Sequence, residues 1–241
     1  MIRPYKRLAE LYDKEEWGKF SIKYINILKD LKNRYNFFTH SILDISCGTG
    51  DLINELSREY VVVGSDKSVE MIKIAKRKYP HLTFYVSDMI DLSLENKFDL
   101  ILSPFDSINY IIKQNNLKKA FKNIYYLLNE KGYFLFDFNT DKLFADKCIG
   151  IPIERKAAGI NFKQICEYNK ETRIAKTTFD FGKGIEEVHI QRAYNDGEIK
   201  NILKGAGFEI KYSFDILKNE FVSDNSYKIL IFAKKLIDVS T

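Results

Sequence analysis

The stretch between residues 42 and 139 alternates short apolar runs with amphipathic segments, and this alternation restricts the possible folds of the 241-residue chain most strongly. We interpret the apolar runs as strands, at residues 42–46, 60–66, 82–88, 98–104 and 133–139. Apolar residues at helical spacing predict helices between them, at residues 50–58, 68–79 and 115–132. Ser68 is the expected N-cap of the second helix, and Gly132 is the expected terminator of the third. Strands that alternate with helices form a parallel sheet with helices on both faces.

The segments on either side extend this pattern. Residues 7–34 have helical periodicity. After residue 140 the pattern changes, and we expect strands on both sides of a turn within residues 160–182 and a further strand at 185–194. A helix at 196–207 and strands at 208–215 and 227–235 complete the chain.

The expected fold is therefore α/β, with a doubly wound, seven-stranded, mostly parallel sheet. Residues 1–140 and 195–241 form the core with an N-terminal helical cap, and residues 141–194 form a small antiparallel β insert. We expect this insert to cover the ligand cleft as a lid, and an oligomer contact is the alternative. Ligands of such sheets bind beyond the carboxyl ends of the strands, where the strand order reverses.

Charge and composition narrow the class of protein. The formal net charge is +5, but lysines and glutamates are interleaved, which predicts a solvated surface and makes a nucleic-acid partner unlikely on this pattern. The N-terminus lacks a signal-peptide pattern, and no apolar stretch is long enough to span a bilayer. The cysteines and histidines are scattered, at Cys47, Cys148, Cys166, His40, His81 and His189. Their spacing predicts neither a disulfide framework nor a metal site, so we expect a cytoplasmic protein without a bound metal.

A glycine-containing turn follows the first strand, in the sequence "ILDISCGTGDLINEL". A strand that breaks at glycines and continues as a helix commonly holds a small ligand, although a purely structural turn is the alternative. The dinucleotide-binding fingerprint needs a third small residue after Gly48 and Gly50, and Ile53 occupies that position. The turn therefore argues against a tightly held pyrophosphate.

Two carboxylates follow at the ends of the next strands. Asp66 ends the second strand, where a carboxylate can accept hydrogen bonds from both hydroxyls of a ribose. Asp88 ends the third strand, where it can accept a hydrogen bond from an adenine amino group, and Met89 can lie against the base. Each aspartate alone could instead cap a helix or lie in a solvated turn. Their order after the glycine turn predicts an adenosine site.

Four consecutive motifs carry a family resemblance: "ILDISCGTGDL", "VVVGSDKSVEMIKIAK", "VSDMIDL" and "FDLILSPFDSINYI". Together they resemble the class I S-adenosylmethionine-dependent methyltransferases, which have a Rossmann-like fold, over residues 5–235. The chain is most similar to the small-molecule branch that includes glycine and aminosugar N-methyltransferases. That branch also has an N-terminal Tyr-Asp pair, here Tyr12-Asp13, and an antiparallel insert after the fifth strand.

The resemblance implies S-adenosylmethionine as cofactor and assigns roles along the site. The methionine end would lie on Ser46, Gly48 and Gly50, with Asp44 beneath the turn orienting the ammonium group. The implied contacts to the remaining parts of the cofactor are Asp66 and the Lys67 backbone for the ribose, Asp88 and Met89 for the adenine, and Pro104 for the sulfonium region. Tyr12 and Trp17 would close over the cofactor, although each could instead be a packing residue.

The acceptor side is predicted from the loop "SPFDSINYI". Methyl transfer from a sulfonium requires alignment of the reacting atoms, and it requires a general base only if the acceptor arrives protonated. The loop lacks the second proline of enzymes that methylate nucleobase amines, and Tyr110 stands where aminosugar enzymes have histidine. Tyr12, Asp106 and Tyr110 are the catalytic candidates. Asp106 or Tyr110 could orient or deprotonate an acceptor, although Asp106 could instead be a plain turn residue, and the Tyr12 ring could favour the cation electrostatically.

The predicted function is methyl transfer to a small molecule, at a nitrogen or an oxygen, by a monomer or homodimer. An RNA-modifying methyltransferase is one alternative, suggested by the basic balance and the Lys-, Phe- and Tyr-rich insert. A non-catalytic cofactor-binding protein of the same fold is another, because the fold alone does not prove chemistry.

Overall fold

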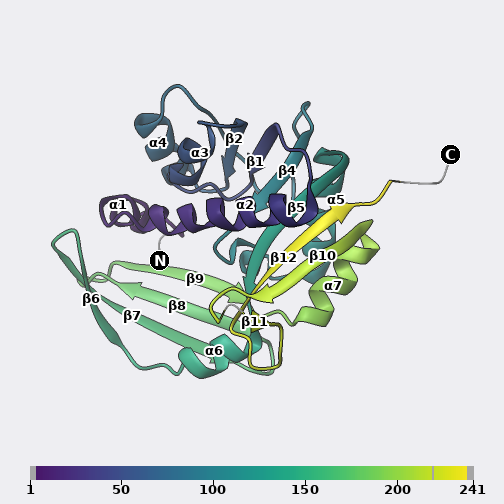
Figure 1. Cartoon of the computed structure of the whole chain (residues 1–241). Helices are drawn as coiled ribbons and strands as arrows, with labels where there is room; N and C mark the ends of the chain where they lie inside the picture. Colours follow the sequence, from purple (N-terminus) through teal and green to yellow (C-terminus); the bar gives the residue numbers. More distant parts are fainter. Residues whose placement is uncertain (1–3, 219, 238–241) are drawn as a thin grey trace.

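The structure is a computed structural model, and it describes residues 4–218 and 220–237 (Figure 1). An eight-stranded sheet has the order β11-β10-β12-β5-β4-β1-β2-β3, and a separate four-stranded sheet has the order β6-β7-β8-β9. The strands of the large sheet are β1 (Ser41–Asp44), β2 (Val61–Asp66), β3 (Thr83–Val86), β4 (Phe98–Ser103), β5 (Leu128–Asn139), β10 (Phe208–Asp215), β11 (Glu220–Phe221) and β12 (Lys228–Lys235). The small sheet contains β6 (Ile153–Ala157), β7 (Ile160–Asn169), β8 (Ile174–Asp180) and β9 (Glu186–Arg192).

Helices cover both faces of the large sheet. They are α1 (Leu8–Lys14), α2 (Lys23–Tyr35), α3 (Asp51–Leu56), α4 (Val69–Lys78), α5 (Gln114–Leu127), α6 (Asp141–Lys147) and α7 (Asp196–Gly205), with short 3₁₀ helices η1 (Trp17–Ile22) and η2 (Ser107–Tyr110). None of the helices in the described residues is long and apolar enough to cross a membrane. The expected α/β class is confirmed, and the short strand β11 adds one strand to the expected seven.

The strand order reverses beside β1. β1 pairs in parallel with β2 on one side and with β4 on the other, while β5, β12 and β10 extend the sheet beyond β4 with antiparallel pairs at β12. The loops after β1 and β4 therefore diverge to opposite faces at the carboxyl edge, which is where such sheets bind ligands.

The unbroken apolar runs of the central strands are explained by burial on both faces. In β5, Phe134, Phe136 and Phe138 pack with α5 and α7 on one face, while Tyr133 and Leu135 pack with α2 on the other. Strands covered on both faces lose the usual alternation of apolar and polar residues. β2 is an exception at its start, where Val61 is exposed.

The third predicted helix ends earlier than its sequence suggested. α5 stops at Leu127, and Gly132 lies inside β5 instead of terminating the helix. Gly132 is required there for a different reason: a Cβ would lie 2.9 Å from the carbonyl oxygen of Asn129. The single helical region expected at residues 7–34 is divided into α1, η1 and α2.

The insert contains the three expected strands and two elements that its sequence did not reveal, α6 and β6. The expectation of no disulfide is wrong, because Cys148 and Cys166 are bonded. The segment after α6 pairs with β7 through Ile149 and Glu167, and this pairing brings the two cysteines together. Cys47 is a free, buried thiol. Cytoplasmic localisation stays a prediction.

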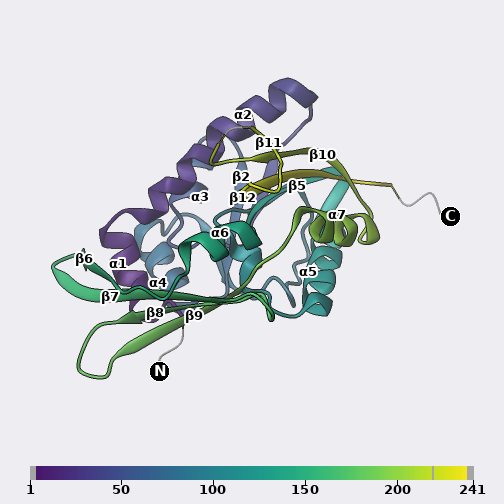
Figure 2. The same ribbon diagram turned by 90° about the horizontal axis from the view of Figure 1, so that it is seen from below.

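Helix α1 lies between the four-stranded sheet of the insert and helix α4 of the core (Figure 1). Leu8 and Leu11 pack against Phe162 of the insert, while Ala9 packs against Met71 and Ile74 of α4. Figure 2 shows the four-stranded sheet at one side of the molecule, next to α1. The N-terminal segment, defined here as residues 4–22, thereby joins the insert to the core.

Phe232 tests the packing of the large sheet. It is fully buried and stacks on Tyr133 with ring centroids 4.7 Å apart. Phe232→Ala should lower the free energy of unfolding by about 3–5 kcal/mol through loss of apolar contacts and a residual cavity. Urea denaturation measures this value. Phe221→Ala is the matched control, because Phe221 is 87% exposed in β11, and its effect should stay within about 0.5 kcal/mol. Equal losses in the two variants would contradict the packing described here.

Candidate active site

A pocket opens at the carboxyl edge of the large sheet, beside the point where the strand order reverses. The turn after β1, the ends of β2 and β3, and the loop after β4 all contribute to its wall. The structure brings together in this wall most of the residues expected from sequence, namely Tyr12, Ser46, Gly48, Asp66, Lys67, Asp88, Met89, Asp106 and Tyr110. Trp17, Asp44, Gly50 and Pro104 lie next to this wall but do not line the pocket. Tyr5 and Phe105 line it and were missed.

The glycine turn after β1 depends on left-handed backbone. Gly48 has φ of 53° and Gly50 has φ of 87°, a region that disfavours residues with a Cβ. At Gly50 a Cβ would also lie 2.9 Å from Phe84. At Gly48 it would reach only Tyr12, at 3.9 Å, so the ring of Tyr12 lies over the turn.

Asp66 ties this turn to the end of β2. Its Oδ2 accepts a hydrogen bond from the Gly48 N–H at 3.0 Å, and its Oδ1 accepts one from the Ser68 N–H at 2.8 Å. Burial raises the pKa of Asp66 despite these hydrogen bonds. Each carboxylate oxygen has a second lone pair, so Asp66 can still accept hydrogen bonds from a ligand in the pocket.

Asp88 extends the same edge after β3. Its Oδ1 accepts a hydrogen bond from the Ile90 N–H at 3.0 Å, and the remaining lone pairs of the carboxylate can serve a ligand. Met89 lies beside it in the wall. These groups fit S-adenosylmethionine. The free lone pairs of Asp66 and Asp88 suit the ribose hydroxyls and the adenine amino group, the Met89 thioether suits the base, and the glycine turn suits the amino-acid end.

Asp44 lies beneath the turn and is 1% exposed. It accepts a hydrogen bond from the Ser46 N–H at 2.9 Å. Burial nevertheless raises the pKa of Asp44 to about 7. From this position Asp44 could orient the ammonium group of a ligand indirectly, through the turn. That role stays a prediction.

The loop after β4 has unusual backbone at its centre. Phe105 and Asp106 both have positive φ, of 60° and 47°, which costs about 1–3 kcal/mol at each residue. Asp137 of β5, which is 1% exposed, compensates by accepting hydrogen bonds from both backbone N–H groups, at 3.1 and 2.5 Å. Sequence reasoning missed Asp137, although a carboxylate inside an apolar strand is a detectable signal.

The Asp106 side chain is engaged on both oxygens. Lys228 donates to Oδ1 at 2.6 Å, and Gln191 of the insert donates to Oδ2 at 2.7 Å. Asp106 is therefore held in place at the pocket wall by β12 and β9. Pro104 is buried behind the wall, and its carbonyl oxygen accepts a hydrogen bond from the Ser107 hydroxyl at 2.9 Å.

The N-terminal segment is fastened over the site by an ion-pair network. Lys78 of α4 lies 2.6 Å from Asp13 and 2.9 Å from Asp51, which begins α3. Tyr12 therefore projects from a helix that is held to α4 through the next residue, Asp13. The ring of Trp17 meets that of Tyr12 edge-on at 5.9 Å, so Trp17 supports Tyr12 from outside the pocket wall.

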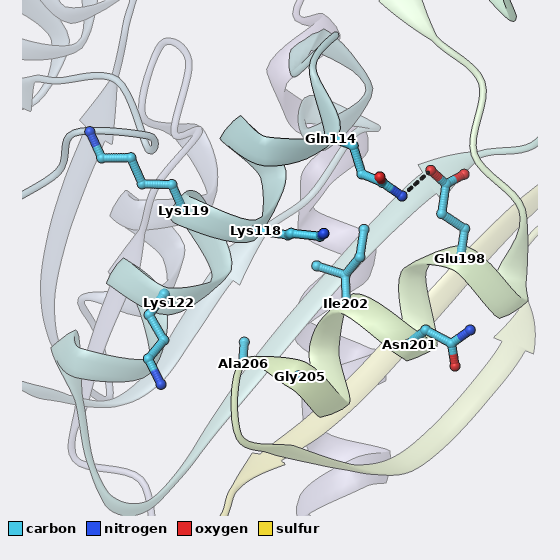
Figure 3. A pocket seen from close by; sticks show the side chains of 9 residues that line it. All are labelled: Gln114, Lys118, Lys119, Lys122, Glu198, Asn201, Ile202, Gly205 and Ala206. Atoms are coloured by element: carbon cyan, nitrogen blue, oxygen red, sulfur yellow. Dashed lines mark hydrogen bonds between the residues drawn. The ribbon is translucent and has the colours of Figure 1, made fainter.

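A more voluminous hollow, of about 860 Å³, lies between α5 and α7 and shares no lining residue with the pocket at the sheet edge. Figure 3 shows Lys118, Lys119 and Lys122 on the α5 side and Glu198, hydrogen-bonded to Gln114, on the α7 side. It is lined by exposed lysines, and it has neither a glycine turn nor the aspartates that line the pocket at the sheet edge. Within the described residues, no group of three or more His, Cys, Asp or Glu side chains could hold a metal ion.

Comparison with known proteins identifies the family. Residues 42–132 match the family described as "Methyltransferase domain". "Putative methyltransferase YqeM" of Bacillus subtilis is 30% identical, over 70% of this chain and 73% of its own length. A "dTDP-3-amino-3,4,6-trideoxy-alpha-D-glucopyranose N,N-dimethyltransferase" of Streptomyces venezuelae is 25% identical, over 71% of this chain and 76% of its own.

A solved structure shows the same fold over nearly the whole chain. It is an S-adenosylmethionine-dependent methyltransferase from Clostridium acetobutylicum, with a TM-score of 0.80 and 24% identity, covering 97% of this chain and 99% of that one. The chain belongs to the methyltransferases, and it shares the fold of that solved enzyme. The resemblance inferred from the four sequence motifs is thereby confirmed.

The buried carboxyl group of Asp44 should make the free energy of unfolding fall as pH rises. The folded protein keeps the Asp44 proton up to about pH 7, whereas the unfolded chain releases it near pH 4. Between these values the unfolded state binds fewer protons, so the contribution of Asp44 to the free energy of unfolding falls as pH rises. Relative to Asp44→Asn, the wild type should lose about 2 kcal/mol between about pH 5 and about pH 7, as measured by urea denaturation.

Asp99→Asn is the control for this measurement. Although burial raises the pKa of Asp99, hydrogen bonds from Asn129 and Ser41 lower it overall. Its ionisation therefore lies below the tested window, and the difference between Asp99→Asn and wild type should stay constant there. A constant difference for Asp44→Asn as well would show that Asp44 is already ionised at pH 5.

Proposed function

We propose that this protein transfers a methyl group from S-adenosylmethionine to the amino group of a small polar molecule, of the aminosugar type. The observation that carries the proposal is the charge of the pocket wall. Asp66, Asp88 and Asp106 contribute carboxylates to it, and Lys67 is the one cationic side chain among the described lining residues. Asp106 is paired with Lys228 behind the wall, so Asp66 and Asp88 carry most of the acidic character. An acidic wall attracts a sulfonium cofactor and an amine, and it repels carboxylated or phosphorylated groups at the acceptor position.

The cofactor half of the site consists of the strand ends. Backbone groups of the Ser46–Gly50 turn would hold the methionine end, Asp66 the ribose hydroxyls, and Asp88 with Met89 the adenine. When bound, the cofactor supplies a methyl group already activated on a sulfonium sulfur. The chain has to hold the acceptor in line with that methyl group and keep water out.

Aromatic side chains would form the acceptor half of the site. Tyr5, Tyr12, Phe105 and Tyr110 line the pocket around the place where the two substrates would meet. Their rings exclude water, and their faces favour a cation electrostatically. Alignment of two reactants in this way can lower the barrier by about 7–11 kcal/mol. The relative from Streptomyces venezuelae, which acts on an amino sugar, supports an amine as acceptor.

Asp88→Ala tests the cofactor site. Loss of a charged hydrogen-bond acceptor should weaken S-adenosylhomocysteine binding by about 1.5–3 kcal/mol, a rise in Kd of about 10- to 150-fold, measured by calorimetry. Asp91→Ala is the control, because Asp91 is exposed and pairs with Lys119 outside the pocket, and it should bind like the wild type. An unchanged Kd for Asp88→Ala would place the adenine elsewhere, and no binding by the wild type would overturn the proposed cofactor.

The acceptor class is tested by transfer of an isotope-labelled methyl group. An amino sugar without a phosphate group should be labelled at least 100-fold faster than the same sugar with a hydroxyl in place of the amine, because the amine is the stronger nucleophile. Single-stranded RNA should receive no label above background. Preferred labelling of the hydroxyl analogue or of RNA would reject the amine acceptor while leaving the cofactor assignment intact.

A further inference from the structure

Strand β9 of the insert places two buried ionisable side chains behind the pocket wall. Glu187 and His189 are two residues apart in the strand, so they face the same side, and they are 0% and 4% exposed. His189 Nε2 lies 2.8 Å from Glu187 Oε1, and His189 Nδ1 lies 2.8 Å from the Tyr110 hydroxyl oxygen. Tyr110 itself lines the pocket. A continuous chain of hydrogen bonds therefore runs from the pocket to a buried carboxylate.

Glu187 is held in its ionised form by its neighbours. Its Oε1 accepts a hydrogen bond from the Tyr5 N–H at 2.6 Å, and its Oε2 accepts from the N–H groups of Arg7 and Leu8 at 2.8 and 3.2 Å. Burial raises the pKa of Glu187, but the hydrogen bonds from His189, Arg7 and Leu8 lower it overall. Because backbone N–H groups only donate, the carboxylate is an acceptor in each of these contacts.

An ionised Glu187 determines which nitrogen of His189 carries the proton. It can only accept, so His189 donates from Nε2. The neutral imidazole then presents a bare Nδ1 to Tyr110, whose hydroxyl donates to it. The Tyr5 hydroxyl, 3.0 Å away, donates in turn to the Tyr110 oxygen. The remaining lone pair of that oxygen is available to a group in the pocket.

Tyr110 can transfer a proton while it remains a neutral phenol, because its phenolate form is disfavoured. Burial, together with the nearby carboxylates of Asp106 and Glu187, raises the pKa of Tyr110 well above its usual value, although the hydrogen bond from Tyr5 lowers it. A phenol in this setting stays neutral by releasing one proton while it accepts another.

We propose that Tyr110, His189 and Glu187 form a proton relay that deprotonates the amine acceptor, a role that rests on the proposed function. Tyr110 is the catalytic residue, and His189 and Glu187 are positioning residues that act through it. A proton of the acceptor's ammonium group passes to the Tyr110 oxygen as the phenolic proton passes to His189 Nδ1. The acceptor is left as a neutral amine with a free lone pair. The positive charge moves to the imidazole, beside the Glu187 carboxylate.

The groups around His189 allow this transfer. The titratable groups that face it are Glu187 on its own strand, Tyr110 from η2 and Tyr5 from the N-terminal segment. From β8 it meets the ring of Phe179, which does not titrate. Glu187 is the one group in this set that carries a negative charge at neutral pH, and it lies on the side of the ring away from the pocket.

The tautomer of His189 tests the relay without any acceptor. In the ligand-free protein with ¹⁵N-labelled histidine, the neutral imidazole of His189 should show a protonated Nε2 and a bare Nδ1 in the NMR spectrum. His189→Asn assigns the signals by their loss. A protonated Nδ1 would overturn the proposal, because that nitrogen could not receive the proton of Tyr110.

The pH profile separates a relay from a structural role. At about pH 7, His189→Asn and Tyr110→Phe should each lower kcat for an amine acceptor by about 100-fold, while the Kd of S-adenosylhomocysteine stays within about twofold. The defect should shrink as pH rises, because an amine that is already deprotonated needs no relay. A loss of kcat that is the same at every pH would assign His189 a structural role and overturn the proposal.

His81→Asn is the matched control, because His81 is exposed and does not line the pocket, and it should behave like the wild type. Failure of the proposed function is distinguishable from failure of the relay. Wild-type protein that binds S-adenosylhomocysteine but methylates no amine would refute the proposed acceptor and with it the acceptor step of the relay. The tautomer measurement decides independently whether Tyr110 can release a proton to His189.

Discussion

The carboxylate of Asp51, at the end of the glycine turn, is the group on which the arrangement of the site depends. It pairs with Lys78 at 2.9 Å and accepts a hydrogen bond from the Tyr79 hydroxyl at 2.8 Å. Gly18 approaches so closely that a Cβ there would lie 2.2 Å from Asp51 Oδ2. Lys78 also pairs with Asp13, so one carboxylate connects α3, α4 and the N-terminal segment. Removing one partner of a fully buried charge pair costs about 3–5 kcal/mol, and the cost here should be lower because the Lys78 side chain is 24% exposed.

The N-terminal segment has a second attachment, on the insert. Glu187 accepts hydrogen bonds from the first N–H groups of α1, which have no partner within the helix, and its negative charge favours that end of the helix dipole. One end of α1 is therefore fixed by the insert sheet and the other by Asp13 and the core. Both attachments position aromatic side chains over the strand ends, so the acceptor half of the site exists only when the two sheets and α1 are assembled.

The grouping of the residues proposed to hold the cofactor could be predicted from the sequence because its signals are local. The glycine turn, Asp66 and Asp88 each follow a strand directly, and parallel strands bring their carboxyl ends to one edge. The acceptor half could not be predicted in the same way. His189 meets Tyr110 across 79 residues of sequence, and Glu187 meets Tyr5 across 182. Nothing near either residue in the chain indicates such a contact. The bond between Cys148 and Cys166 was missed for the same reason, since it depends on how α6 returns to β7.

The double attachment of α1 also has a kinetic consequence. Tyr12 lies over the glycine turn, and its helix is fixed at both ends. Movement of this helix away from the turn would therefore require release of the Glu187 contacts at one end or of the Lys78 ion pairs at the other. Lid movements of this kind take microseconds to milliseconds. A helix fastened at two points should open less often than one fastened at a single point.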